Sequence, residues 1–206
     1  AKLGTPDANV IHPAEAKTES NDNFDSIPVK NPNLDYNKPA VVIFHTHTTE
    51  SYTPTEKFTY VEEGGVHRTR DKSFDVCRVG EEIKNYIEQY YGLAVVHDTT
   101  IHDYPSFDAS YKRSRVTVES LVKKYPEAKI YIDLHRDAEV PKDKITADIK
   151  GDKAAKVMFV IGKGNPHWQE NYQLSQKINQ KIEDLYPTLA RTIDVKMKSI
   201  YNQDIS

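Results

Sequence analysis

The apolar positions of the chain form short β-branched runs that alternate with segments in which apolar residues recur every three or four positions. Three runs have the composition of strands buried on both faces: 40–44, 93–97 and 129–134. Three segments have the spacing of amphipathic helices and end at Gly92, Pro126 and Pro187: 75–91, 107–125 and 165–187. This alternation predicts an α/β fold with a mainly parallel, twisted sheet flanked by helices.

The second half of the chain adds shorter strand patterns. The runs 145–149 and 155–161 are joined across Gly151-Asp152, a strong turn signal, which predicts an antiparallel excursion and makes the sheet mixed. The better run, 155–161, is expected to be central. Asn165 is expected to cap the last helix, and at most one strand follows Thr192.

Two segments lack a periodic pattern. Residues 1–39 are rich in proline and polar side chains and are interpreted as an extended tether, so that the folded domain is 40–206. The segment 48–70 is long for a structureless loop, which favours a functional flap or a short hairpin about Gly64-Gly65.

The charge and the cysteine content of the chain limit the binding partners and metal ligands that it can use. The 206 residues carry 28 basic and 31 acidic side chains, a net charge of −3, so no footprint for nucleic acid or an acidic membrane surface is present. The single cysteine, Cys77, cannot form an internal disulfide and lies in a predicted helix as a small core residue. Histidines and carboxylates are therefore the plausible metal ligands. The chain contains no apolar run of 18 residues and thus no membrane span or signal peptide.

Histidines and carboxylates follow the first and third predicted strands directly. His47 and Glu50 lie three residues apart after the first strand, and His135 follows the third. Because ligands collect outside the carboxyl ends of parallel strands, these side chains are expected to meet. Two histidines and a carboxylate are a common ligand set of catalytic zinc. The sequence therefore predicts a Zn²⁺ site formed by His47, Glu50 and His135.

Several neighbours have open roles. In a strand His45 would point the same way as His47, so either ligates while the other orients a ligand or contacts substrate. Asp133 either supports the site or is a buried carboxylate paired with Arg136 or a backbone amide. Arg136 and Asp137 are candidates to bind a substrate carboxylate and to polarise the site, unless they simply pair with each other. The cluster 97–104 is either a rim of the cleft or loop structure.

Motifs in six places carry a family resemblance. These are His45–Tyr52, Arg78–Glu81, His97-Asp98 with His102–Ser106, Asp133–Asp137, Val157–Val160 and Tyr201–Asp204. In order and combination they resemble the stage II sporulation protein P family of endospore-forming Firmicutes. The resemblance implies a phosphorylase/hydrolase-like α/β fold of the zinc amidase type. It also implies a zinc-dependent N-acetylmuramoyl-L-alanine amidase with endopeptidase activity on peptide cross-links of peptidoglycan.

The resemblance also implies a cellular setting and further site residues. The family acts in forespore engulfment, anchored in the mother-cell membrane by an N-terminal span that is absent here, and works with sporulation proteins D and M. It places a catalytic glutamate in a segment after Tyr201–Asp204, which is expected beyond Ser206. Related amidases take their carboxylate ligand from the start of the first helix, which keeps Asp75 and Glu81 as alternatives to Glu50.

Two other functions remain compatible with the residues. One is a peptidoglycan-binding or assembly module without catalysis. The other is a zinc carboxypeptidase, in which Arg136 would bind the terminal carboxylate. The aromatic side chains of the 52–60 loop, Tyr52 among them, are suited to stacking on sugar rings.

Overall fold

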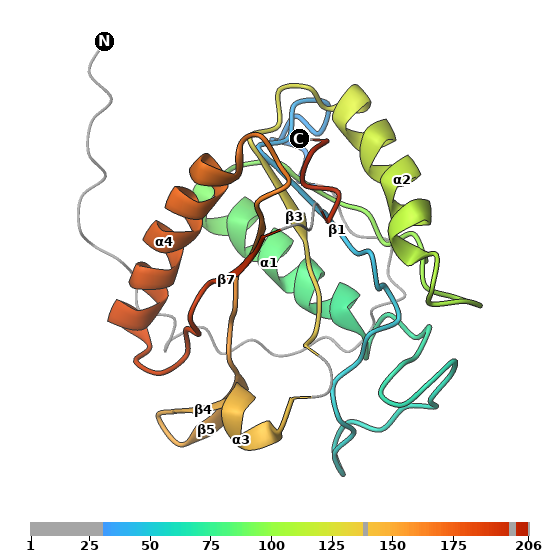
Figure 1. Cartoon of the computed structure of the whole chain (residues 1–206), viewed down its shortest axis with the longest axis vertical. Coiled ribbons are helices and arrows are strands. Elements are labelled where there is room, and N and C mark those ends of the chain that lie inside the picture. Colours follow the sequence, from blue (N-terminus) through green and yellow to red (C-terminus); the bar gives the residue numbers. More distant parts are fainter. Residues whose placement is uncertain (1–30, 138–139, 198–200, 206) are drawn as a thin grey trace.

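A computed structural model describes residues 31–137, 140–197 and 201–205 of the chain. They form a mixed α/β fold in which a small parallel sheet is flanked by helices (Figure 1). The strands are β1 (Val41–Phe44), β2 (Val95–His97), β3 (Ile130–Asp133), β4 (Thr146–Ile149), β5 (Asp152–Ala155), β6 (Val160–Gly162) and β7 (Asp194–Lys196). The helices are α1 (Val76–Tyr91), α2 (Ser110–Lys124), α3 (Lys142–Ile145) and α4 (Trp168–Leu185).

The three strands predicted from buried runs form one parallel sheet. Its order is β2-β1-β3, so the first strand in sequence is central. In the register, Ile43 lies opposite His97 and Phe44 lies opposite Asp133, which places the carboxyl ends of all three strands at one edge. The residues that leave these strands therefore start from the same side of the sheet.

The two faces of β1 pack against different helices. Val42 and Phe44 belong to a cluster with Val118 and Leu121 of α2. Val41 and Ile43 belong to a second cluster, against which Ile83 of α1 packs. Successive side chains of a strand point to opposite faces. Val42 and Phe44 therefore face α2, and Val41 and Ile43 face α1. The buried run of β1 thus joins both halves of the core.

Helix α1 is closed at both ends as the sequence predicts. Asp75 is the N-cap, and its Oδ1 accepts a hydrogen bond from the Cys77 amide at 2.8 Å. At the other end Gly92 is left-handed, with φ 61°. Glycine adopts this conformation without steric cost, which makes it the favoured residue after a helix.

The Asp75 cap has a pH-dependent cost. Burial raises the pKa of Asp75 to about 7, above its ordinary value of 3.8. The folded chain therefore binds a proton that the unfolded chain has lost, and stability falls as pH rises from about 4 to 7. Asp75→Asn keeps a good cap and removes this titration. We expect the unfolding free energy of Asp75→Asn, relative to that of the parent, to increase by roughly 3 kcal/mol between pH 5 and pH 8.

Urea unfolding of the parent and of Asp75→Asn at several pH values measures this difference. Asp71→Asn is the matched control, since Asp71 also accepts an amide two residues on, from Ser73, but in an exposed turn. An Asp75→Asn curve that runs parallel to the parent curve from pH 5 to 8 would contradict the buried, proton-holding carboxyl.

The second half of the fold differs from the expectation of one sheet. An antiparallel β4-β5 hairpin does form across Gly151, but the predicted strand 155–161 is split. Its first residue, Ala155, ends the hairpin, and its last ones begin β6, which pairs in parallel with β7 in a separate two-stranded sheet. The expectation that this run is central was therefore wrong, because β6 takes a later strand as its partner and β1 occupies the centre.

Helix boundaries shift by a few residues. Helix α2 begins at Ser110, three residues after the predicted start, and α4 begins at Trp168. Asn165 is not the N-cap of α4: its Oδ1 accepts the His167 amide in a turn before the helix. The predicted apolar side of α4 is only partly covered, and Leu174 and Leu185 are each about two-fifths exposed. None of the helices described is long and apolar enough to cross a bilayer.

The two segments without a periodic pattern, 1–39 and 48–70, contact the core where the structure describes them. In the 48–70 loop a turn at Gly64 and Gly65, both with positive φ, is closed by a 2.8 Å hydrogen bond from the Glu63 amide to the Arg68 carbonyl, close to the predicted hairpin. Most of the predicted tether, residues 1–30, lies outside the described residues. Of its remainder, Tyr36 donates a 2.9 Å hydrogen bond to Glu88 of α1.

Candidate functional site

The chain turns sharply after β1, and this turn separates the two histidines of the His-Thr-His motif. Residues 46–49 form a turn in which the Glu50 amide donates to the His47 carbonyl at 3.1 Å. His45 continues the strand alternation toward the α1 side, where its Nε2 lies 2.8 Å from His97 Nε2. His47 instead stacks on Phe107 with ring centroids 4.2 Å apart. The expectation that both histidines point the same way was wrong, because the strand ends at Phe44.

The same turn brings His47 and Glu50 to the third strand end. The ring centroids of His47 and His135 are 5.2 Å apart, and Glu50 Oε2 lies 3.6 Å from His135 Nδ1. The Arg136 amide donates a 2.8 Å hydrogen bond to the same Glu50 oxygen. Thus the three side chains predicted to hold zinc converge at the carboxyl edge of the β2-β1-β3 sheet.

Asp133 fixes the orientation of His135. Its Oδ1 lies 3.1 Å from His135 Nε2, and it also accepts hydrogen bonds from the Thr46 amide at 2.7 Å and the Thr46 hydroxyl at 2.6 Å. Asp133 therefore pairs with a backbone amide and with His135, not with Arg136. A carboxylate behind a histidine is the usual support of a metal-binding imidazole. This leaves His135 Nδ1 directed toward Glu50.

The pKa shifts of His47 and Glu50 fit a metal centre. Burial lowers the pKa of His47, which keeps its imidazole neutral as a ligand must be. Burial alone would lower the pKa of His135, but the Asp133 and Glu50 carboxylates raise it to about 10. In Glu50 the contacts with His135 and with the Arg136 amide outweigh burial and lower the pKa of the carboxyl. Without a metal, His135 is thus an imidazolium between two carboxylates, and it must lose this proton to bind a metal.

The donor set also fits zinc. His47 Nδ1 is buried and has no hydrogen-bond partner among the described residues, so its lone pair is available to a ligand. Two imidazoles and one carboxylate are the ligands of several zinc hydrolases. The ligand assignment itself remains a prediction.

Three side chains around this centre, Phe107, Tyr111 and Arg68, were not singled out from the sequence. Phe107 and Tyr111 lie against His47, the first stacked and the second edge-on at 5.4 Å between centroids. Arg68 sits over the Phe107 ring and donates at 2.7 Å to Asp103. Asp103 in turn accepts the Thr49 amide. An aromatic three residues before a helix, as Phe107 is, carries no sequence signal that separates a site wall from core.

The 97–104 cluster proves to be mainly support for the turn. His102 Nδ1 lies 2.7 Å from the His45 carbonyl, which can only accept, and its Nε2 contacts Thr117 Oγ1 at 2.7 Å. With Asp103 bound to the Thr49 amide, both residues hold the backbone of the turn. His97 is different, since it faces His45 and Glu81.

The predicted substrate residues border the centre. The Arg136 guanidinium donates to the His67 carbonyl at 2.8 Å, and its buried Nε has no partner among the described residues. The Asp137 carboxylate pairs with Arg191, whereas Arg136 reaches only the Asp137 backbone carbonyl, at 3.3 Å. Tyr52 lines a largely apolar hollow of about 270 Å³ with aromatic neighbours that include Phe58 and Tyr60. Their roles toward a substrate remain predictions.

The alternative ligands are used elsewhere. Asp75 caps α1, and Glu81 contacts His97 Nδ1 at 3.0 Å and accepts from Lys84 at 2.9 Å. A second group of possible ligands lies here: one donor atom each of His45, Cys77 and His97 fall within 4.8 Å of one another. Among the described residues no other three histidine, cysteine or carboxylate side chains bring donor atoms this close together, so the donor atoms of His47, Glu50 and His135 lie farther apart. The chain is thus compatible with a metal at a place the sequence did not predict.

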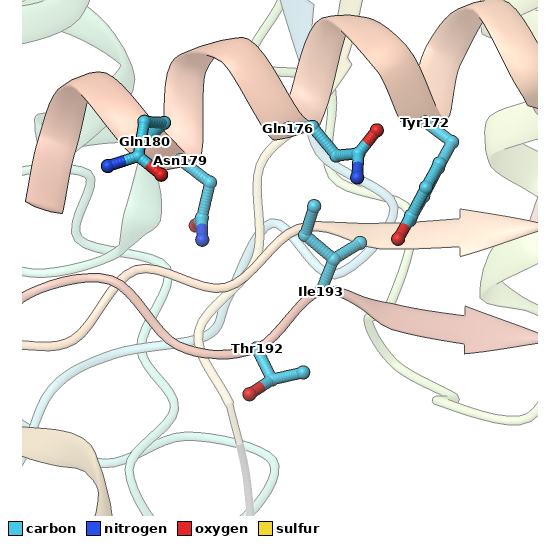
Figure 2. A pocket seen from close by; sticks show the side chains of 6 residues that line it. All are labelled: Tyr172, Gln176, Asn179, Gln180, Thr192 and Ile193. Atoms are coloured by element: carbon cyan, nitrogen blue, oxygen red, sulfur yellow. The ribbon is translucent and has the colours of Figure 1, made fainter.

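A further hollow, of about 290 Å³, lies between α4 and the residues before β7 (Figure 2). Its lining consists of Tyr172, Gln176, Asn179, Gln180, Thr192 and Ile193. Amide side chains hydrogen-bond but do not activate water. This hollow is therefore a weaker candidate for chemistry than the centre at the sheet edge.

The fold and the site together define an α/β protein with a histidine and carboxylate centre at the carboxyl edge of a parallel sheet. Comparison with known proteins specifies it further. The family model "Stage II sporulation protein P (SpoIIP)" matches residues 5–206, and the chain belongs to this family. It is 32% identical over 209 residues to the stage II sporulation protein P of Bacillus subtilis (strain 168), covering 97% of this chain and 50% of that protein. The chain thus spans about half the length of this relative. No solved structure matches.

Proposed function

We propose that the chain is the catalytic part of a zinc-dependent peptidoglycan hydrolase that cleaves the amide between N-acetylmuramic acid and L-alanine. The observation that carries the proposal is the convergence of His47, Glu50 and His135 at one sheet edge, with a free buried Nδ1 on His47. Membership in a sporulation family supports a cell-wall substrate. The fold would then be the phosphorylase/hydrolase-like type shared with zinc amidases.

The chain's own residues would divide the work as follows. His47, Glu50 and His135 hold the zinc, which supplies the Lewis acidity that polarises the scissile carbonyl and lowers the pKa of water to about 7. Asp133 holds the His135 ring through Nε2. Phe107 and Tyr111 cover one side of the centre with aromatic surface and exclude water there.

The rim would bind the substrate. Arg136 Nε, buried and free, is placed to bind a carboxylate of the stem peptide, and Tyr52 to contact a sugar or aliphatic group. Asp137 would orient Arg191 through their ion pair rather than act on the site directly. By the family resemblance, the general acid–base glutamate would lie in a segment that follows Tyr201–Asp204. We further propose endopeptidase activity on cross-linked stem peptides and a role in engulfment, outside the mother-cell membrane and together with sporulation proteins D and M.

Digestion of purified sacculi tests the activity. The full-length protein loaded with zinc should release peptides whose new amino terminus is L-alanine, detected by mass spectrometry and by labelling of free amines. A chelator should abolish release and added zinc restore it. Release of single carboxyl-terminal residues alone would favour a carboxypeptidase. Sedimentation with sacculi that survives chelation, without any product, would favour a binding module and overturn the proposal.

A further inference from the structure

In the buried contact between His45 and His97, neither of the two nitrogens that face each other carries a hydrogen, so the contact is unfavourable without a cation between them. His45 Nδ1 lies 2.9 Å from the Leu134 carbonyl, and a carbonyl oxygen can only accept. His45 Nδ1 must therefore carry a hydrogen. In a neutral imidazole only one nitrogen does so, and His45 Nε2 is then an unprotonated lone pair.

His97 is fixed in the same tautomer. Its Nδ1 lies 3.0 Å from Glu81 Oε2, and the other oxygen of Glu81 accepts from Lys84 at 2.9 Å. Because Glu81 forms an ion pair with Lys84, the group is a carboxylate and an acceptor only. The hydrogen sits on His97 Nδ1, and both Nε2 atoms face each other as lone pairs at 2.8 Å. Two lone pairs at this distance repel unless a proton or a metal ion lies between them.

A third donor lies beside the pair. The ligand atoms of His45, His97 and Cys77 are all within 4.8 Å of one another, and the cysteine and His45 are fully buried. Each imidazole donates a hydrogen bond from its Nδ1–H, His45 to the Leu134 carbonyl and His97 to the Glu81 carboxylate, which is the usual arrangement of metal-ligating histidines. Two imidazoles and a thiolate suit zinc and other thiophilic transition ions.

Helix α1 is shaped to leave room at this place. Gly80 lies mid-helix, where glycine costs about 1 kcal/mol relative to alanine. A Cβ at this position would lie 2.6 Å from His97 Nε2 and 3.2 Å from His45 Nε2. The space at the nitrogen pair thus depends on the glycine.

We propose that His45, His97 and Cys77 form a second metal site that is selective for zinc-like thiophilic ions. It lies between α1 and the carboxyl ends of β1 and β2. It is separate from the centre at His47, Glu50 and His135, and it does not depend on the proposed hydrolase activity. On binding, the Nε2 atoms part from 2.8 Å to about 3.3 Å, the separation that Zn–N bonds of about 2.05 Å give in a tetrahedral site. The Cys77 thiol exchanges its S–H bond for an S–metal bond and releases the proton to solvent.

Because His45 Nδ1 binds the Leu134 carbonyl, next to His135, the buried ion would also fasten the third strand end to the first. The expected role is structural, since Cys77 and His45 are fully buried and the His97 side chain is only 3% exposed, which leaves no approach for a substrate.

Cobalt titration of the metal-stripped chain tests the site. The parent should bind two equivalents of Co²⁺, one of which produces the intense near-ultraviolet absorption of a thiolate-to-cobalt charge transfer. Cys77→Ser should lose that band and one equivalent. Gly80→Ala should lose both as well, because its Cβ occupies the space at the nitrogen pair. His47→Ala should retain the band and lose only the other equivalent.

The parent spectrum alone decides the outcome if a variant fails to fold. A parent that binds cobalt without a thiolate band overturns the proposal and leaves a proton shared between His45 and His97. The same holds if a folded Cys77→Ser variant binds as many equivalents as the parent.

Discussion

His135→Ala is expected to lower the hydrolysis of peptidoglycan amides by about a thousandfold or more, since a lost zinc ligand removes several kcal/mol of transition-state stabilisation. The change deletes the imidazole between Asp133 and Glu50 and leaves these two carboxylates facing each other without a cation. Release of free L-alanine amino termini from sacculi, measured for the zinc-loaded full-length protein, gives the rate.

His167→Ala is the matched control for this variant. His167 lies at the start of α4, is largely exposed and pairs only with the nearby Glu170 in the described structure. Its loss should leave the rate within about twofold, because exposed ion pairs contribute about 0–1 kcal/mol. If His135→Ala kept a rate close to that of His167→Ala, His135 could not be part of the catalytic centre.

Asp133→Ala is expected to destabilise the fold by about 3 kcal/mol or more and to weaken zinc binding about 10- to 100-fold. Asp133 accepts from the Thr46 amide and hydroxyl and contacts His135, so its removal leaves buried donors unpaired and frees the His135 ring. An unsatisfied buried donor costs about 1–3 kcal/mol each. Urea unfolding measures the first effect, and competition with a chromophoric chelator measures the second.

Asp137→Ala tests whether the loss of any carboxylate near the site destabilises the fold as much as the loss of Asp133 does. Asp137 pairs with Arg191 at a partly exposed position, and its loss should cost about 0–1 kcal/mol. Equal destabilisation by Asp133→Ala and Asp137→Ala would show that the Thr46 and His135 contacts do not hold the turn.

The parts of the fold that the sequence predicted well are those in which local pattern and tertiary packing agree. The run 41–44 became the central strand because its residues are buried on both faces, and α1 ended at Gly92 because that position is left-handed. The strand split after Ala155 was not predictable, since an apolar run carries no information about which later strand it will pair with.

The same distinction holds for the site. Convergence of His47, Glu50 and His135 followed from the rule that parallel strands end at one edge. The divergence of His45 from His47 depends on the turn at 46–49, which the distant His102 and Asp103 hold in place. Phe107, Tyr111 and Arg68 reach the centre only through tertiary packing, and the pairing of His45 with His97 joins two strands about fifty residues apart.

Zinc content per chain after dialysis against a weak chelator tests the central claim most directly. His47→Ala, Glu50→Ala and His135→Ala should each lose the same single equivalent relative to the parent, while His167→Ala retains it. This result would join the ends of two strands into one metal centre. Parent-like zinc content in all three variants would contradict the account, because the metal would then be held by residues other than those at the sheet edge.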